Sequence, residues 1–332
     1  MSDTRFDVVA IGNAIVDIIG RCDDAFLAGH GAAKGHMRLV DAPTIDTLYA
    51  AMGPAIEISG GSAANTMVGL SSFGGRAAFI GKVAGDEFGH IFRHDIGAAG
   101  VKFDSLAVNG KAPTSRSLIL VTPDGERTMN TFLGISTELD HGEVDPDLIA
   151  ASGIVYLEGY LFDRPEAKAA FRQAQAIARK AGRRVALTLS DGFCVDRHRA
   201  EFLSLIRDGI DILFANESEI TALYETASFD DAARRAAADV PLAVLTRSAK
   251  GSVIFEEGLA ITVAAEPVTK VVDTTGAGDL YAAGFLYGLT KGRSLETAGR
   301  LGSLAAAEII SHVGARPETG LAGLAKAHGL IA

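Results

Sequence analysis

Hydrophobic residues occur along this chain in two kinds of segment. Short runs rich in Val, Ile and Leu alternate with longer, Ala-rich segments of helical character. The short runs predict strands at Phe6–Ile11, Ala77–Gly81, Ile154–Leu157, Arg184–Leu189, Ile210–Phe214 and Leu242–Thr246. The longer segments predict helices at Ser62–Phe73, Glu87–Ala99, Pro165–Ala181, Arg197–Arg207, Glu217–Tyr224 and Phe229–Ala238. Near-continuous apolar strands that alternate with helices are typical of an α/β fold whose mostly parallel sheet is covered on both faces.

Two regions depart from this alternation. Ile18–Val40 and Leu106–Phe132 have β-type patterns, with no helix expected between their strands, and Pro123-Asp124-Gly125 predicts a hairpin turn. We therefore expect a small β-sheet inserted into one main domain that spans residues 1–332. The insertions, at about 14–58 and about 106–136, are expected to form a lid over a site at the carboxyl ends of the main strands.

Composition narrows the classes of protein that fit. The 332 residues are 48% hydrophobic and 22% charged, which excludes a disordered chain. The formal net charge of −10 argues against a nucleic-acid partner, although amides at a helix N-terminus can bind an anion even in an acidic protein. No apolar run reaches the roughly 18–20 residues of a membrane span, so no membrane partner is expected. Cys22 and Cys194 are expected to be reduced thiols in the cytoplasm.

A glycine-rich segment near the C-terminus has the strongest chemical character. Asp273–Asp279 (DTTGAGD) precedes the helix-like run LYAAGFLYGL. Small residues let the backbone turn sharply, so that successive N–H groups of Gly276, Ala277 and Gly278 point at one spot at the positive end of a helix dipole. Such an anion hole suits a migrating phosphoryl group, and Asp279 beside it can accept the proton of an attacking hydroxyl. By itself the segment is equally compatible with a glycine-rich turn that ends in an acidic cap.

Three further groups of polar residues follow predicted strands. Asn216 and Glu219 are three residues apart and share one helix face, which suits the outer shell of a magnesium ion. The Gly-Gly pair that ends at Gly61 lets a ligand approach the backbone, and Asn65 can bridge hydroxyl groups. Asp17 lies just after the first strand, where its carboxylate can bind two vicinal hydroxyls, as a ribose offers. Each group is also compatible with an ordinary helix or strand end.

Several of these strings resemble motifs of the ribokinase-like (PfkB) carbohydrate kinases. Asp273–Asp279 is similar to that family's C-terminal signature, in which the last Asp is the catalytic base. Asn216–Glu219 (NESE) looks like its Asn-x-x-Glu motif for magnesium and phosphates, and Thr246–Gly251 (TRSAKG) looks like its nucleotide-binding turn. Ser59–Asn65 (SGGSAAN) is similar to its N-terminal signature. The resemblance implies a three-layer α/β/α fold with a small inserted β-sheet lid, and no Walker A loop is present.

Within this family the chain looks most like the adenosine kinases. Asn13 and Asp17 are four residues apart, as in adenosine kinases, whereas ribokinases usually have Asn and Asp two residues apart. The segments VYLEGYLF, ALTLSDGF, DILFANESE and AAAEIISHVGARP also resemble adenosine kinases, so that the likeness covers essentially the whole chain. One departure concerns Glu158–Leu161 (EGYL), where animal enzymes have aromatic residues after Ala-Gly. This departure leaves the preferred base open.

The resemblance implies a role for each matching position. It implies that Asp279 is the base, assisted by the amides of Gly276, Ala277 and Gly278 and by the phosphate-neutralising Arg127. It implies that the ribose is bound by Asn13, Asp17, Gly61 and Asn65, and that the nucleobase is enclosed by Ile15, Leu39, Met129 and Leu161. It implies that ATP is bound by Asn216, Thr246, Arg247 and Gly251, and that magnesium is bound through Glu219 and Asn216.

The implied activity is ATP-dependent phosphorylation of the 5′-hydroxyl of adenosine, with magnesium as the metal. The alternative is a sugar kinase for ribose or fructose, or a kinase for another nucleoside, of the same family. A catalytically silent nucleotide sensor is disfavoured because Asp279, Asn216 and Glu219 are all present. As in some relatives, a potassium ion is a further candidate near Asp273 and Ser311–Gly314. The chain is expected to be a monomer or a homodimer.

Overall fold

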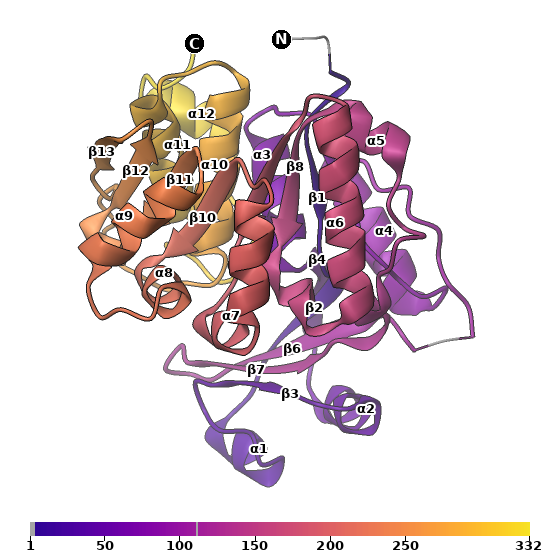
Figure 1. Ribbon diagram of the computed structural model, residues 1–332. Helices are drawn as coiled ribbons and strands as arrows, with labels where there is room; N and C mark the ends of the chain where they lie inside the picture. The colour runs from indigo at the N-terminus through magenta and orange to yellow at the C-terminus, as the bar shows by residue number, and fades with distance from the viewer. Residues whose placement is uncertain (1–3, 111) are drawn as a thin grey trace.

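The computed structural model describes residues 4–110 and 112–332 and contains two sheets (Figure 1). The main sheet has eight strands in the order β13-β12-β11-β10-β9-β8-β1-β5. It is parallel from β11 to β5, and β12 and β13 add two antiparallel strands at one edge. The strands are β1 Phe6–Ile11, β5 Ala77–Ile80, β8 Ser152–Glu158, β9 Arg184–Thr188, β10 Ile212–Asn216, β11 Leu242–Thr246, β12 Ser252–Glu256 and β13 Leu259–Val263. All six predicted strands are confirmed.

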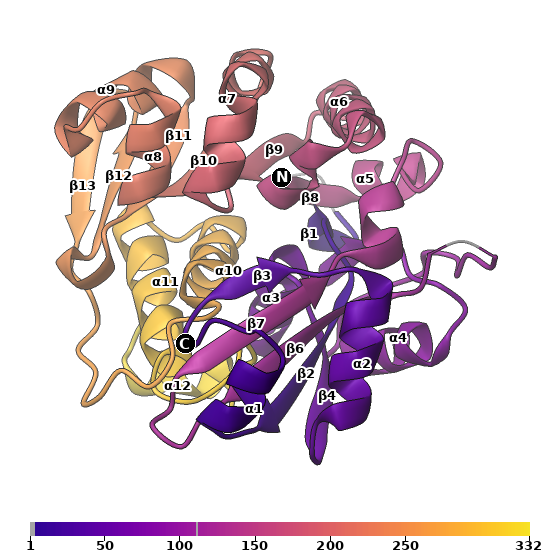
Figure 2. The same ribbon diagram turned by 90° about the horizontal axis from the view of Figure 1, so that it is seen from below.

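Helices cover both faces of this sheet (Figure 2). One face bears α5 Pro146–Ala150, α6 Pro165–Lys180, α7 Gly192–Arg207, α8 Glu217–Leu223 and α9 Phe229–Asp239. The other face bears α3 Ser62–Ser72, α4 Glu87–Ala98, α10 Ala277–Thr290 and α11 Leu295–Ile309, with α12 Leu321–Ala327 packed outside them. The expected three-layer architecture is therefore confirmed, and so are the six predicted helices. No helix in the described part of the chain is long and apolar enough to cross a membrane.

Helix α10 is buried along most of its length, between α3 and α11. The close approach of α11 requires glycine, because a Cβ on Gly284 would lie 2.4 Å from the Leu301 carbonyl oxygen. On the other side, Leu280 and Ala283 approach α3 so closely that a Cβ on Gly69 would lie within 2.7 Å of each. This packing fixes the N-terminus of α10 against the N-terminus of α3.

The second sheet has five strands in the order β3-β7-β6-β2-β4 and lies across the carboxyl ends of the main strands (Figure 1). Its strands are β2 Ile15–Arg21, β3 Met37–Leu39, β4 Ala55–Gly60, β6 Ser115–Val121 and β7 Arg127–Phe132. The predicted hairpin turn is confirmed: β6 and β7 are antiparallel, and Gly125, whose φ is +89°, donates its amide to Thr122 O. Lys111, which falls in the second expected insertion, and residues 1–3 of the expected domain lie outside the described residues.

The expectation that no helix interrupts the first β-type region was wrong. Helix α1 (Asp24–Gly29) lies between β2 and β3, and α2 (Ala42–Ala51) lies between β3 and β4. Each begins at an aspartate cap: Asp23 accepts the Phe26 amide at 2.8 Å, and Asp41 accepts the Thr44 amide at 3.0 Å. These helices form because the outer face of the second sheet is apolar and needs a cover, which Leu27 and Leu48 help to supply.

Candidate active site

The glycine-rich segment turns at the start of α10 as expected, but the Ala277 amide is not free, because it donates to Thr274 O at 3.2 Å. Gly276 adopts a left-handed conformation with φ +78°, and α10 begins at the next residue. The amides of Gly278 and Asp279 donate to no described residue. A Cβ on Gly276 would lie 2.9 Å from that of Ala315, so the turn needs a residue without a side chain. Two free amides at the start of a 14-residue helix are a ready site for a phosphate group.

Asp279 lies in the first turn of α10 and is held by residues of α3. Ser62 Oγ donates to Asp279 Oδ1 at 2.6 Å, and Asn65 Nδ2 donates to Oδ2 at 3.2 Å. Burial raises the pKa of Asp279 above its ordinary value, while these two hydrogen bonds and the charge of Arg316 act in the opposite direction. A carboxylate in this position, beside the free amides, can serve as a base for a hydroxyl that attacks a bound phosphoryl group.

Two polar side chains lie near Asp279: Asp17 of β2 and Asn65 of α3. The Asp17 side chain is 8% exposed and its carboxylate accepts no hydrogen bond from any described residue. Burial raises the pKa of Asp17 to about 6. Asn65 Oδ1 is a second buried acceptor without a partner. Two unpartnered acceptors close to Asp279 fit a ligand that carries hydroxyl groups.

The glycine pair before α3 lies directly against Asp17 and Asn13. A Cβ on Gly60 would lie 2.2 Å from Asp17 Oδ2. Gly61 has φ +98°, and a Cβ there would lie 2.2 Å from the Asn13 carbonyl oxygen. Both positions therefore require glycine.

Asn13 is buried, but both ends of its side-chain amide bind protein groups. Its Nδ2 donates to Glu158 Oε1 at 2.7 Å, and its Oδ1 accepts from Ser136 Oγ at 2.8 Å. The sequence analysis missed Glu158 as a site residue. This buried carboxylate also accepts the Ala63 amide at 2.8 Å, and burial raises its pKa to about 7. The only sequence signal for it was an acidic residue at the end of an apolar strand.

The register of the second sheet shows which residues share a face with Asp17. Asp17 pairs with Ser117, Ser117 with Thr131, and Thr131 with Leu39, so that these four side chains share one face. By the same alternation Ile15 and Met129 lie on that face, and the exposed fraction of Leu39 is 59%. The structure therefore places the three expected base-contacting residues of this sheet on one face, the face that bears Asp17. Leu161 does not join them, because it is buried in the core beneath α6 and α7.

Arg127 connects the second sheet to the glycine-rich segment. It begins β7, and its Nη1 donates to Asp273 and, at 2.7 Å, to Thr275 Oγ1. Its Nε and Nη2 are buried without a partner, so donors remain for a phosphate. Asp273 also accepts the amides of Thr275 and Gly314, at 3.0 and 2.9 Å. Burial raises the pKa of Asp273, but these donors outweigh burial and lower the pKa below its ordinary value. They also occupy both carboxylate oxygens of Asp273, near which a potassium ion was a candidate.

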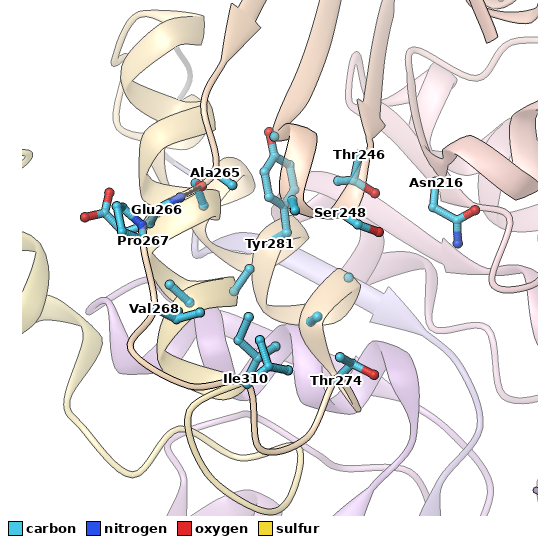
Figure 3. Close-up of a pocket in the computed structure, with 18 residues that line it drawn as sticks. Asn216, Thr246, Ser248, Ala265, Glu266, Pro267, Val268, Thr274, Tyr281 and Ile310 are labelled. Carbon is cyan, nitrogen blue, oxygen red and sulfur yellow. Dashed lines mark hydrogen bonds between the residues drawn. The ribbon is translucent and has the colours of Figure 1, made fainter. Parts of the chain in front are cut away.

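A cavity of about 700 Å³ extends from the loop after β11 to the start of α10 (Figure 3). Thr246 and Gly251 line it, and so does Gly278 at the start of α10. Its walls include the apolar residues Ala265, Pro267, Val268, Val271 and Ile310. A cavity of this size, with an apolar wall and the free Gly278 amide in its lining, fits a nucleotide. Arg247 does not line it: its guanidinium lies 3.9 Å from the Phe229 ring centroid and pairs with Glu217.

Asn216 and Glu219 form a capping box at the start of α8. Asn216 Nδ2 donates to Glu219 Oε1 at 2.6 Å, and each backbone amide donates to the other side chain. Burial, reinforced by the charges of Asp191 and Asp279, raises the pKa of Glu219 to about 7, so that a nearby cation would favour its ionised form. The described residues include no cluster of three or more candidate metal ligands. This donor set fits magnesium, which keeps most of its waters and binds phosphates.

The carboxyl edge of the main sheet also presents two aromatic side chains that the motifs did not indicate. Tyr160 follows β8 and is 39% exposed, and Phe193, at the start of α7, is 78% exposed. A large exposed aromatic beside a cleft is unusual enough to suggest a ligand that stacks on it. The only sequence signal was their position directly after predicted strands.

Comparison with known proteins gives a consistent result. A model of the pfkB family of carbohydrate kinases matches residues 57–319. Adenosine kinase from Sinorhizobium meliloti is 54% identical, and its crystal structure superposes with a TM-score of 0.90 over 98% of this chain and 99% of that one. A probable sugar kinase from Rhizobium etli is 51% identical, with a TM-score of 0.92 over 99% and 100% of the two chains. Adenosine kinase from Saccharomyces cerevisiae is 28% identical over 330 residues, covering 92% of this chain and 95% of its own.

Proposed function

The chain belongs to the pfkB family of carbohydrate kinases and is an ATP-dependent phosphotransferase; from this premise we propose that its acceptor is the 5′-hydroxyl of adenosine. One observation carries the proposal: Asp279 lies beside two free amides, while Asp17 and Asn65 Oδ1 offer unpartnered acceptors near it. A ribose whose vicinal hydroxyls bind Asp17 and Asn65 would direct its 5′-hydroxyl toward Asp279. The 54% identity to an adenosine kinase supports this acceptor over a free sugar.

The reaction then follows from the geometry. The 5′-oxygen forms a bond to the γ-phosphorus while the bond from that phosphorus to the bridging oxygen of ADP breaks. The proton of the hydroxyl passes to Asp279. The amides of Gly278 and Asp279, with the free donors of Arg127, stabilise the negative charge of the transferring group. Magnesium, bound through Glu219 and Asn216, would supply charge neutralisation on the phosphates of ATP.

A purine acceptor needs an apolar enclosure that a free sugar does not. The inner face of the second sheet offers Ile15, Leu39 and Met129 beside Asp17. Phe193, at the start of α7, offers a largely exposed aromatic ring after the carboxyl end of β9. A flat base between an aliphatic surface and an aromatic ring would bury area on both of its faces.

An acceptor screen tests the proposal. ATP consumption is measured with adenosine, inosine, guanosine, ribose and fructose, for the wild type and for Phe193→Ala. We expect adenosine to be the best substrate, and the substitution to raise its KM about 10-fold through lost stacking. Ribose, which makes no base contact, serves as the internal control. A wild type that prefers ribose or fructose to every nucleoside would show that the protein is a sugar kinase.

We also propose that the second sheet, about residues 14–58 and 106–136, is a lid. It contributes Asp17 and Arg127, whereas Asn65 and Asp279 belong to the main domain. A nucleoside that binds Asp17 and Asn65 at once would hold the two parts together and exclude water from the phosphoryl group. Hydrogen exchange of the Ser115–Phe132 amides should therefore slow on addition of adenosine without ATP. Unchanged exchange at saturating adenosine would mean that the sheet is a static wall.

A further inference from the structure

Arg316 lies in the loop between α11 and α12, yet it contacts the turn between β4 and α3. Its Nε donates to Ser59 O at 2.8 Å, its Nη1 to Ala64 O at 3.1 Å, and its Nη2 to Ser59 O and Ser59 Oγ. Asp95 of α4 completes the arrangement by accepting the Ser59 amide and hydroxyl at 2.8 and 2.6 Å. The turn that bears the glycine pair is therefore held from both sides.

All of these Arg316 acceptors are neutral oxygens. No carboxylate among residues 4–110 and 112–332 forms an ion pair with Arg316, so its positive charge is not cancelled by a direct partner. Three carboxylates nevertheless interact electrostatically with that charge: Asp17 of β2, Asp95 of α4 and Asp279 of α10. Burial lowers the pKa of Arg316 to about 10, which still leaves it charged at neutral pH.

The site needs such a charge because it holds several acids close together. Burial and the charge of Asp279 both raise the pKa of Asp17, and Glu158 of β8 also lies near Asp279. Arg127 of β7 is the other cation that acts on Asp17, but it is bound to Asp273 and is placed to meet phosphate. Arg316 acts on both Asp17 and Asp279 and has no competing ion pair.

We infer that Arg316 is a positioning residue for phosphoryl transfer, which locks the turn Ser59–Ser62 and supplies the positive charge that lets Asp17 and Asp279 be ionised together. The first role acts through geometry, since Ser62 and Asn65 on α3 hold the Asp279 carboxylate. The second role acts through the electrostatic field of Arg316, since a cation without an ion-pair partner favours the ionised forms of Asp17 and Asp279. The inference rests on the proposed function for its kinetic consequences only.

Two substitutions separate the roles. Arg316→Gln keeps hydrogen-bond donors and removes the charge, whereas Arg316→Lys keeps the charge and removes the planar fork. For R316Q we expect the acid limb of the pH profile of kcat/KM to move upward by about one pH unit, because Asp17 and Asp279 protonate more readily. For R316K we expect an unmoved acid limb and a kcat about 3- to 10-fold lower, because Asp279 is less well held.

Thermal unfolding without ligand provides a test that does not depend on the acceptor. A carboxyl group whose pKa is raised on folding binds its proton more tightly in the folded state, so stability falls as pH rises from its ordinary pKa to its folded pKa. For Asp17 that decline ends near pH 6 in the wild type. In R316Q the fall in Tm with rising pH should continue above pH 6. In the double variant D17N/R316Q, most of this additional fall should be absent.

The outcomes distinguish the two proposals. A wild type that phosphorylates none of the acceptors overturns the proposed function, while the dependence of Tm on pH still tests Arg316. An R316Q variant with the wild-type acid limb and the wild-type Tm curve overturns the charge role, and an R316K variant with wild-type kcat overturns the positioning role. If R316Q fails to fold, the double variant D17N/R316Q should fold; its failure would also contradict the charge role.

Discussion

Asp279→Asn should lower kcat by about 100- to 10,000-fold while leaving the affinities for acceptor and ATP within a few-fold of the wild type. The amide has nearly the shape of the carboxylate, so that Ser62 can still donate to its oxygen and the packing of α10 against α3 is preserved. It cannot accept the proton of the attacking hydroxyl. Steady-state kinetics, with calorimetric titration of each substrate, separate the loss of chemistry from a loss of binding.

Ser62→Ala is the matched control for this experiment. It removes one hydrogen bond to Asp279 but leaves the base itself, so kcat should fall by only about 3- to 10-fold. Because this bond favours the ionised form of Asp279, its loss should also move the acid limb of the profile to higher pH. An Asp279→Asn variant that kept a third of the wild-type activity would show that another group is the base.

The fold was predictable to the extent that each element is determined by its own residues. The six predicted strands form the parallel part of the sheet and are mostly apolar because helices cover both faces, which makes Val8–Ile11 or Leu242–Leu245 recognisable without any neighbour. Strands β12 and β13 were missed, and seven of their ten residues are exposed or partly exposed, as expected toward the edge of a sheet. Helix α1 was missed because six residues between β-type segments form a helix only when Leu27 has a sheet face to cover.

The site was predictable where its chemistry lies in one stretch of chain. Gly276, Gly278 and Asp279 form a motif whose backbone conformation follows from small residues before a helix. Residues that act across the fold left no comparable pattern. Nothing in the sequence near Asn13 indicates that its amide binds Glu158, and nothing near Arg316 indicates that it holds Ser59. Arg247 is a case in which a motif was misleading. It lies within the string that resembles a nucleotide-binding turn, but its side chain packs against Phe229 and does not line the nucleotide cavity.

Asp17→Asn should weaken the binding of ribonucleosides by about 2–3 kcal/mol, because a charged acceptor for two hydroxyls is replaced by a neutral amide. The wild type should already bind 2′-deoxyadenosine more weakly than adenosine, and the variant should discriminate less between the two. Calorimetric titration of both nucleosides at pH 7.5 measures each affinity. Equal wild-type affinities would remove vicinal-diol recognition from the proposal.

The same substitution should stabilise the free protein. The Asp17 carboxylate is buried without a hydrogen-bond partner, and its pKa is raised to about 6 on folding, so ionising it costs stability. This cost grows as pH rises from about 4 to about 6 and is fully present at pH 7, where Asp17→Asn should raise the free energy of unfolding by about 1–3 kcal/mol. Near pH 4 the wild-type group is protonated in the folded state, and the difference should nearly vanish. If Asp17→Asn were less stable than the wild type at pH 7, the Asp17 carboxylate would have a stabilising partner within the protein. It would then not be an unpartnered acceptor that is free to bind substrate.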